Sequence, residues 1–241
     1  MRSFFIYFSL FSLIMLGAFG AASKTVQNEK IILTERNTVS LKGEINMITA
    51  GKVIGDILNL RKSNPEGKLY LVINSPGGEI DSGLQLVDFL NTQKNIIPIA
   101  INAASMASAI FESMNERLII GGATLMFHRA AGTFSGYFSE GEVESRLAYA
   151  KKMVLRLEKI NSKALHLSLE EYRKQVTVEL WMYGDEAITK HAADRVVEPV
   201  CDSSLISKQV SEERQSLFGS VSIVWSACPL ITLPLSVIQG H

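Results

Sequence analysis

The sequence has few cysteines, few histidines and no excess of charge of either sign. The two cysteines, Cys201 and Cys228, do not form a CxxC motif. The four histidines do not have the spacing of metal ligands. Basic and acidic residues number 24 each, so no basic patch or acidic tail points to a nucleic-acid partner. We therefore expect no metal, no cofactor and no nucleic acid.

The first 22 residues differ from the rest of the chain. One arginine is followed by an apolar run from Phe4 to Leu16 and then by the small residues of GAFGAAS. This order predicts a secretory signal peptide, with an uncleaved membrane anchor as the alternative. We expect an exported protein, periplasmic or otherwise extracytoplasmic. In an exported chain, Cys201 and Cys228 either pair or remain free thiols.

Short apolar runs alternate with amphipathic segments over residues 23–203. Residues 69–75 and 96–101 are typical of buried parallel strands, and residues 140–166 of one long helix. Residues 117–120 and 124–128 are expected to be two separate strands. The alternation predicts an α/β layered domain with a mostly parallel sheet and flanking helices.

Residues 204–241 form a C-terminal tail to which the sequence assigns no role. Residues 217–237 are apolar and lack charge, but Pro229 and Pro234 argue against a transmembrane helix. A tail that contacts a partner or a membrane is the interpretation left open.

Polar or glycine residues follow three of the expected strands at their carboxyl ends, where α/β sheets bind ligands. Gly77 and Gly78 follow the first strand, Ser105 the second and His128 the third. Singly, these are an ordinary turn, a helix N-cap and a structural histidine. Together, a serine, a base and the backbone amides of the glycine turn and of Met106 predict acyl transfer.

Three motifs occur in an order that resembles the proteolytic subunit of the Clp protease, a serine peptidase family with a crotonase-like fold. They are INSPGG (73–78), ASMAS (104–108) and MFHR (126–129). Residues 39–60 and 183–200 resemble the segments that flank these motifs in the family. The resemblance covers about residues 30–200.

This resemblance implies a role for each matching residue. Ser105 is the expected nucleophile and His128 the expected general base. The amides of Gly78 and Met106 are expected to form the oxyanion hole, and Gly77 belongs to the edge that binds the substrate as an added β-strand. The implied substrate is a peptide or an unfolded protein.

One position departs from the family pattern. Where the family has its catalytic aspartate, this sequence has Gln175, and Glu179, four residues further on, would substitute for it if the backbone shifts. An amide accepts the imidazole N–H but does not stabilise the imidazolium by charge, a change that lowers the rate about 10⁴-fold in a serine protease triad. The site is thus a Ser–His pair or a triad with a displaced acid.

Family members assemble as stacked rings joined through the long helix, and an ATPase feeds them in the cytoplasm. The resemblance therefore implies a homo-oligomeric ring. Because an exported copy has neither ATP nor that partner, we expect ATP-independent cleavage. A cytoplasmic location would restore the Clp ATPase as a partner.

Three alternatives stay open at this point. A membrane-associated Ser–Lys peptidase of the same fold would use Lys151 or Lys152 as the base. A non-catalytic protein would still bind peptides by strand addition. Gln175, at the position of the family's catalytic aspartate, favours this interpretation. A crotonase-type acyl-CoA enzyme would not need Ser105 together with His128.

Overall fold

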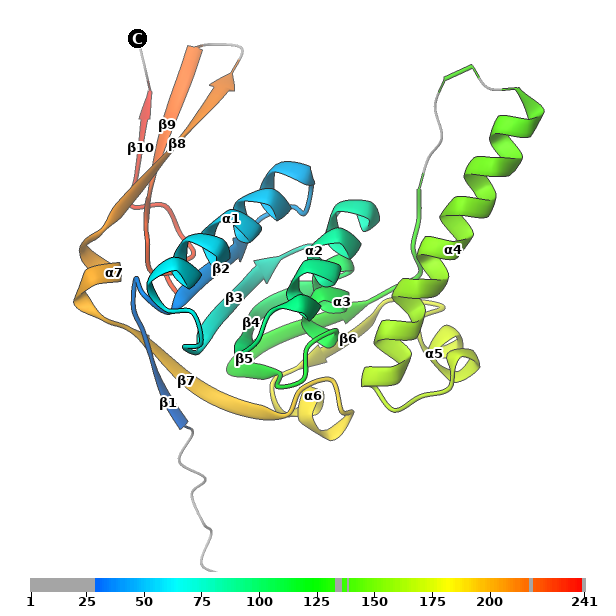
Figure 1. Ribbon diagram of the computed structural model, residues 1–241, viewed down its shortest axis with the longest axis horizontal. Helices are drawn as coiled ribbons and strands as arrows, with labels where there is room; N and C mark the ends of the chain where they lie inside the picture. The colour runs from blue at the N-terminus through cyan, green and yellow to red at the C-terminus, as the bar shows by residue number, and fades with distance from the viewer. Residues whose placement is uncertain (1–28, 133–135, 138, 217–218, 240–241) are drawn as a thin grey trace, which may run out of the picture.

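The computed structural model describes residues 29–132, 136–137, 139–216 and 219–239 (Figure 1). The expected signal peptide lies outside these residues. The strands are β1 (Glu29–Leu33), β2 (Thr38–Lys42), β3 (Leu69–Ser75), β4 (Ile96–Ala104), β5 (Leu118–Phe127), β6 (Leu180–Tyr183), β7 (Arg195–Cys201), β8 (Gln209–Ser216), β9 (Gly219–Ser226) and β10 (Ser236–Gln239). The helices are α1 (Met47–Ser63), α2 (Ile80–Thr92), α3 (Met106–Glu112), α4 (Glu140–Ala164), α5 (Leu169–Gln175), α6 (Asp185–Thr189) and α7 (Ser203–Ser207).

The main sheet has seven strands and is mostly parallel, as predicted. Six strands follow the order β1-β7-β5-β4-β3-β2 with parallel pairing, and β6 pairs antiparallel with β5. The central strands β3 and β4 are apolar and buried on both faces, as parallel strands covered by other elements must be. The α/β prediction is therefore confirmed.

A single strand, β5, spans Leu118–Phe127, where we expected two separate strands. β5 pairs with β7 through Leu118–Ile120 and with β6 through Thr124–Phe127. Between these halves, Gly121 and Gly122 are exposed and remain within the strand. The glycines let β5 exchange one neighbouring strand for another without ending.

Helices α1, α2 and α3 pack on one face of the main sheet, and α4 projects beyond them (Figure 1). α1 begins with a capping box, in which the Asn46 side chain accepts from the amides of Ile48 and Thr49. α4 lies almost where the sequence places the long helix. Its distal half is polar and exposed, whereas Leu157 and Asn161 near its end are buried.

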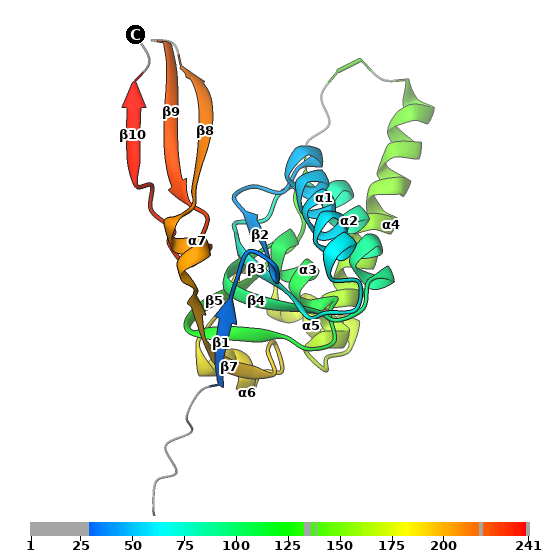
Figure 2. The same cartoon turned by 60° about the vertical axis from the view of Figure 1, so that its left-hand side comes forward.

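The C-terminal tail forms a second, three-stranded antiparallel sheet in the order β10-β9-β8 (Figure 2). A disulfide between Cys201 and Cys228 joins the end of β7 to the segment after β9. Leu230 and Ile231 in that segment pack on the face of the main sheet opposite α1 and α2. Among the described residues, no helix is long and apolar enough to cross a membrane.

Candidate active site

Ser105 lies on the sharp turn between β4 and α3. It is the N-cap of α3 and has a φ of 56°, a left-handed conformation that non-glycine residues seldom adopt. Its amide donates to the carbonyl of Met126 at 2.9 Å. The buried hydroxyl of Ser108 contacts the same carbonyl at 2.6 Å. These bonds fix the turn against the end of β5.

His128 follows β5 directly, two residues after the carbonyl that anchors the turn. Its Nε2 lies 2.6 Å from Ser105 Oγ. Both side chains are half-buried, so they are accessible to a substrate. In the tautomer with the proton on Nδ1, Nε2 accepts the hydrogen bond from the hydroxyl, as a general base must.

Gly77 and Gly78 form the turn after β3, beside Ser105. Their φ values of 96° and 149° lie in the region that favours glycine. A Cβ on Gly78 would lie 2.7 Å from the Ile45 amide nitrogen, and one on Gly77 would lie 2.6 Å from the Ala104 carbonyl. The glycine turn thus lies against the backbone at Ile45 on one side and at Ala104 on the other, and only glycine fits there.

The amides at this turn are available to a ligand. Within the described residues, neither the N–H of Gly78 nor that of Met106 donates a hydrogen bond. The Met106 side chain is buried against Gly83 of α2 and leaves the front of the site clear. Two unpaired donors beside a serine hydroxyl have the chemistry of an oxyanion hole.

A small cavity of about 50 Å³ opens at these groups, and we call it the site cavity. It is lined by Gly78, Ser105 and His128, and by Ile80, Leu157 and Asn161 from α2 and α4. The sheet edge thus supplies the reactive groups, while the helices supply the walls.

The comparison with protein families agrees with this geometry. Residues 21–200 match the sequence profile of the Clp protease family. The chain belongs to the Clp protease family. The match spans every element that lines the site cavity and ends at Val200, before α7 and the second sheet. The fold expected from the three motifs is therefore shown, and the C-terminal sheet lies beyond the matched region.

Among the described residues, neither Gln175 nor Glu179 forms a hydrogen bond with His128. Gln175 lines a separate surface depression of about 550 Å³ together with Leu180 and Lys190. The Glu179 carboxylate accepts a hydrogen bond from Trp181 Nε1 at 2.9 Å. Within the described residues, His128 has no hydrogen-bond partner besides Ser105. The structure thus joins Ser105 to His128 and leaves Gln175 and Glu179 apart from them.

The alternative lysine bases do not reach the serine either. Lys151 and Lys152 lie on the exposed surface of α4, and neither lines the site cavity. A Ser–Lys site therefore has no support in this fold.

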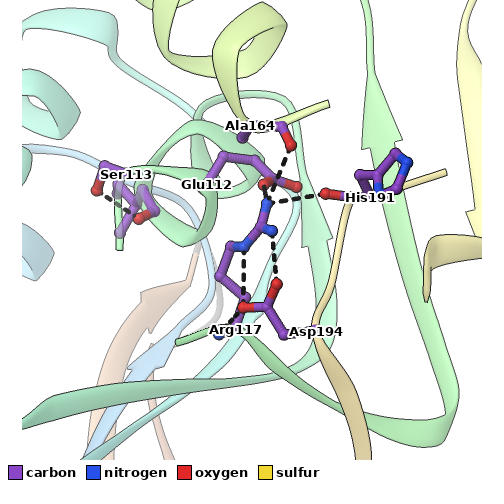
Figure 3. Close-up of polar contacts among 7 residues, drawn as sticks. Glu112, Ser113, Arg117, Ala164, His191 and Asp194 are labelled. Carbon is purple, nitrogen blue, oxygen red and sulfur yellow. Dashed lines mark hydrogen bonds and ion pairs between the residues drawn. The ribbon is translucent and has the colours of Figure 1, made fainter. Parts of the chain in front are cut away.

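A buried ion-pair network, which the motifs do not reveal, lies at the far end of α3 (Figure 3). Arg117 Nη1 contacts Glu112 Oε2 at 2.5 Å, and Nη2 contacts Asp194 Oδ1 at 2.7 Å. Arg117 also donates to the His191 carbonyl at 2.9 Å. Burial raises the pKa of Glu112 to about 8, against the charge and hydrogen bond of Arg117. The network ties the helix behind Ser105 to β5 and β7.

Asn161 is a further buried polar residue that belongs to none of the three motifs. It is four residues after Leu157, so both lie on the buried side of α4, and it is only 1% exposed. The sequence shows that Asn161 is a polar residue on the apolar face of the predicted helix. Only the structure shows that this face, with Leu157, lines the site cavity.

Proposed function

We propose that this protein is a serine peptidase that hydrolyses peptide bonds at Ser105. The observation that carries the proposal is the 2.6 Å contact between Ser105 Oγ and His128 Nε2, beside two unpaired backbone amides. Family membership adds the expectation of peptide or unfolded-protein substrates.

The reaction follows from the positions of these groups. His128 takes the hydroxyl proton as Ser105 Oγ attacks the substrate carbonyl, and the amides of Gly78 and Met106 stabilise the oxyanion. The tetrahedral intermediate breaks down when His128 protonates the leaving amine. Water activated by His128 then releases the acyl group from Ser105. No step needs a cofactor.

The missing acid makes this a Ser–His pair. Without a carboxylate, nothing in the described site offsets the imidazolium charge that forms during attack. Loss of that charge in a serine protease triad lowers the rate about 10⁴-fold. The peptidase is therefore expected to be slow as a single chain.

A second candidate function is peptide binding without hydrolysis. The lack of a hydrogen-bond partner for His128 Nδ1 within the described residues favours it. The glycine turn at Gly77 and Gly78 would still bind a peptide as an added strand.

We further propose assembly into a ring through α4. Val143 and Leu147 lie one turn apart in the otherwise polar distal half of this helix and are 47% and 44% exposed, and exposed apolar side chains on one face suit contact with other copies. Analytical ultracentrifugation of the mature chain tests this, and a monomer at micromolar concentration contradicts it.

We also propose export and, with it, ATP-independent action. The N-terminal sequence pattern and the Cys201–Cys228 disulfide support an oxidising compartment. Protease shaving of fractionated cells tests the location. A purely cytoplasmic pool contradicts it and makes a Clp ATPase the expected partner.

The catalytic proposal is tested by labelling the mature protein with a fluorophosphonate, which reacts with activated serines. The wild type should label, and Ser105→Ala and His128→Ala should not. Ser113→Ala is the matched control, because its hydroxyl bonds only the Ile110 carbonyl at the other end of α3. A folded, assembled wild type that fails to label favours peptide binding.

A further inference from the structure

Asn161 carries an unsatisfied polar atom beside the proposed nucleophile. Its Nδ2 donates to the hydroxyl of Tyr172 at 2.9 Å, which fixes the rotation of the amide. Its Oδ1 is buried and has no hydrogen-bond partner among the described residues. Buried acceptors are almost always paired, so one that lines a binding cavity calls for an explanation.

The rest of the site cavity is small and apolar. Besides the reacting groups, Ile80 and Leu157 line it, together with Ala130 and Ala131. Among the residues that the structure describes, no carboxylate lines it, so a lysine or arginine side chain would enter without an ionic partner there. A volume of about 50 Å³ excludes aromatic side chains in this conformation. The cavity therefore suits a short side chain that is mostly apolar.

A hydroxyl-bearing side chain satisfies both conditions. Threonine presents a methyl group to the apolar walls and an O–H donor to the unpaired carbonyl oxygen. Valine has the same shape but would leave Asn161 Oδ1 without a hydrogen-bond donor. Hydrogen-bonding sites discriminate strongly against ligands that lack the matching polar group.

We propose that Asn161 determines substrate specificity, and that the residue preceding the scissile bond is preferably threonine or serine, whose hydroxyl donates to Asn161 Oδ1. This inference rests on the proposed peptide-binding site at Ser105, because the site cavity adjoins that hydroxyl. Tyr172 acts on the amide only by holding its other end.

Two variants separate specificity from folding. Asn161→Leu combined with Tyr172→Phe removes both partners of the buried hydrogen bond and leaves no polar atom unpaired. Tyr172→Phe alone is the matched control, because it removes the same hydroxyl and keeps the Asn161 carbonyl, although the amide is then free to rotate. The measured quantity is a ratio between two substrates in one protein, which a general loss of stability does not change.

The substrates are two fluorogenic peptides that differ only in threonine or valine before the scissile bond. The wild type should favour threonine in kcat/KM by about 5- to 50-fold, and Tyr172→Phe should show a smaller preference in the same direction. The double variant should favour valine or show a ratio near one. A wild-type ratio near one, or a preference for valine, overturns the proposal.

Binding keeps this test separate from the test of catalysis. The same two peptides are titrated against Ser105→Ala by fluorescence anisotropy, and the same ratio is expected in Kd. Threonine preference in binding without fluorophosphonate labelling contradicts peptidase activity and supports the role of Asn161. Fluorophosphonate labelling without a threonine preference supports peptidase activity and contradicts the role of Asn161. If Ser105→Ala binds neither peptide at millimolar concentration and the wild type cleaves neither, the specificity proposal is wrong.

Discussion

Arg117 and Glu112 form a buried ion pair, with Nη1 and Oε2 2.5 Å apart, at the opposite end of α3 from Ser105. Asp194, whose side chain is partly exposed, contacts the same guanidinium, so one cation serves two carboxyl groups and its single charge balances only one of them. Without Arg117, Asp194 loses its counter-charge and the buried Glu112 carboxyl loses its hydrogen-bond donor. The helix that carries the proposed nucleophile therefore depends on this arginine.

We expect Arg117→Met to destabilise the protein by about 3 to 5 kcal/mol, measured by urea unfolding. Arg195→Met is the matched control, because Arg195 is half-exposed and pairs with Glu29 and Glu116 at the surface. That control should change stability by about 1 kcal/mol or less. Equal losses in the two variants would contradict a special role for the buried network.

Glu112 should also make stability depend on pH. Its pKa is raised by burial to about 8 in the folded state, above the usual value of 4.5. Between these values, the folded protein holds a proton that the unfolded chain has released. The Glu112 contribution is thus complete below pH 4.5 and falls as pH rises toward 8.

Glu112→Gln, which has no charge at any pH, should remove this slope. Urea midpoints of the wild type and the variant are compared from pH 5 to pH 8, where the wild type should lose stability relative to the variant. Other titrating groups cancel in this difference. Parallel curves would mean that Glu112 is ionised throughout this range.

The close approach at the glycine turn predicts a loss of activity in Gly78→Ala. The new Cβ would collide with the backbone of Ile45 and move the amide that faces Ser105. We expect kcat to fall at least about tenfold, in line with losses of oxyanion-hole donors. Gly51→Ala, on the exposed side of α1 with no atom within 4 Å of the added Cβ, should instead stabilise by about 0.5 to 1 kcal/mol. Full activity in Gly78→Ala would remove Gly78 from the proposed mechanism.

The sequence alone predicted the parts of this molecule that repeat a simple pattern. Buried apolar runs and helical periodicity gave the sheet, α1 and α4, and strand ends indicated where Ser105 and His128 meet. It did not predict β5 as one strand, because two adjacent glycines look like a break unless both neighbouring strands are known. It also did not show whether Gln175 or Glu179 would reach His128, since that depends on the path of the backbone after α5.

Buried polar residues escaped prediction for a related reason. The roles of Glu112 and Asn161 depend on partners that lie on other elements of the fold, Arg117 with Asp194 in one case and Tyr172 in the other. The second sheet was missed because β9 is apolar and ends near prolines, which obscures its alternation of valine and serine.

The positions of Gln175 and Glu179 predict that neither supports catalysis in the single chain. Gln175→Ala and Glu179→Ala should each change kcat/KM less than about threefold, since neither side chain bonds His128 and exposed substitutions have small effects. Fluorogenic peptide cleavage measures this, with His128→Ala as the inactive reference. A tenfold loss in either variant would place that residue behind His128 in the working enzyme.

The disulfide should matter most to the C-terminal sheet. Cys201 and Cys228 are 27 residues apart, and closing a loop of that length stabilises a protein by about 3 to 4 kcal/mol. The loop contains α7, β8 and β9, and after it Leu230 and Ile231 pack on the main sheet.

Reduction, or the double substitution Cys201→Ser with Cys228→Ser, should therefore loosen the C-terminal sheet while β3 and β4 of the main sheet stay protected from exchange. Hydrogen exchange followed by mass spectrometry measures it, and dithiothreitol added to the double variant is the control that should have no effect. Unchanged exchange in β8–β10 after reduction would show that packing alone holds the second sheet, and would leave the proposed oxidising compartment without a structural role.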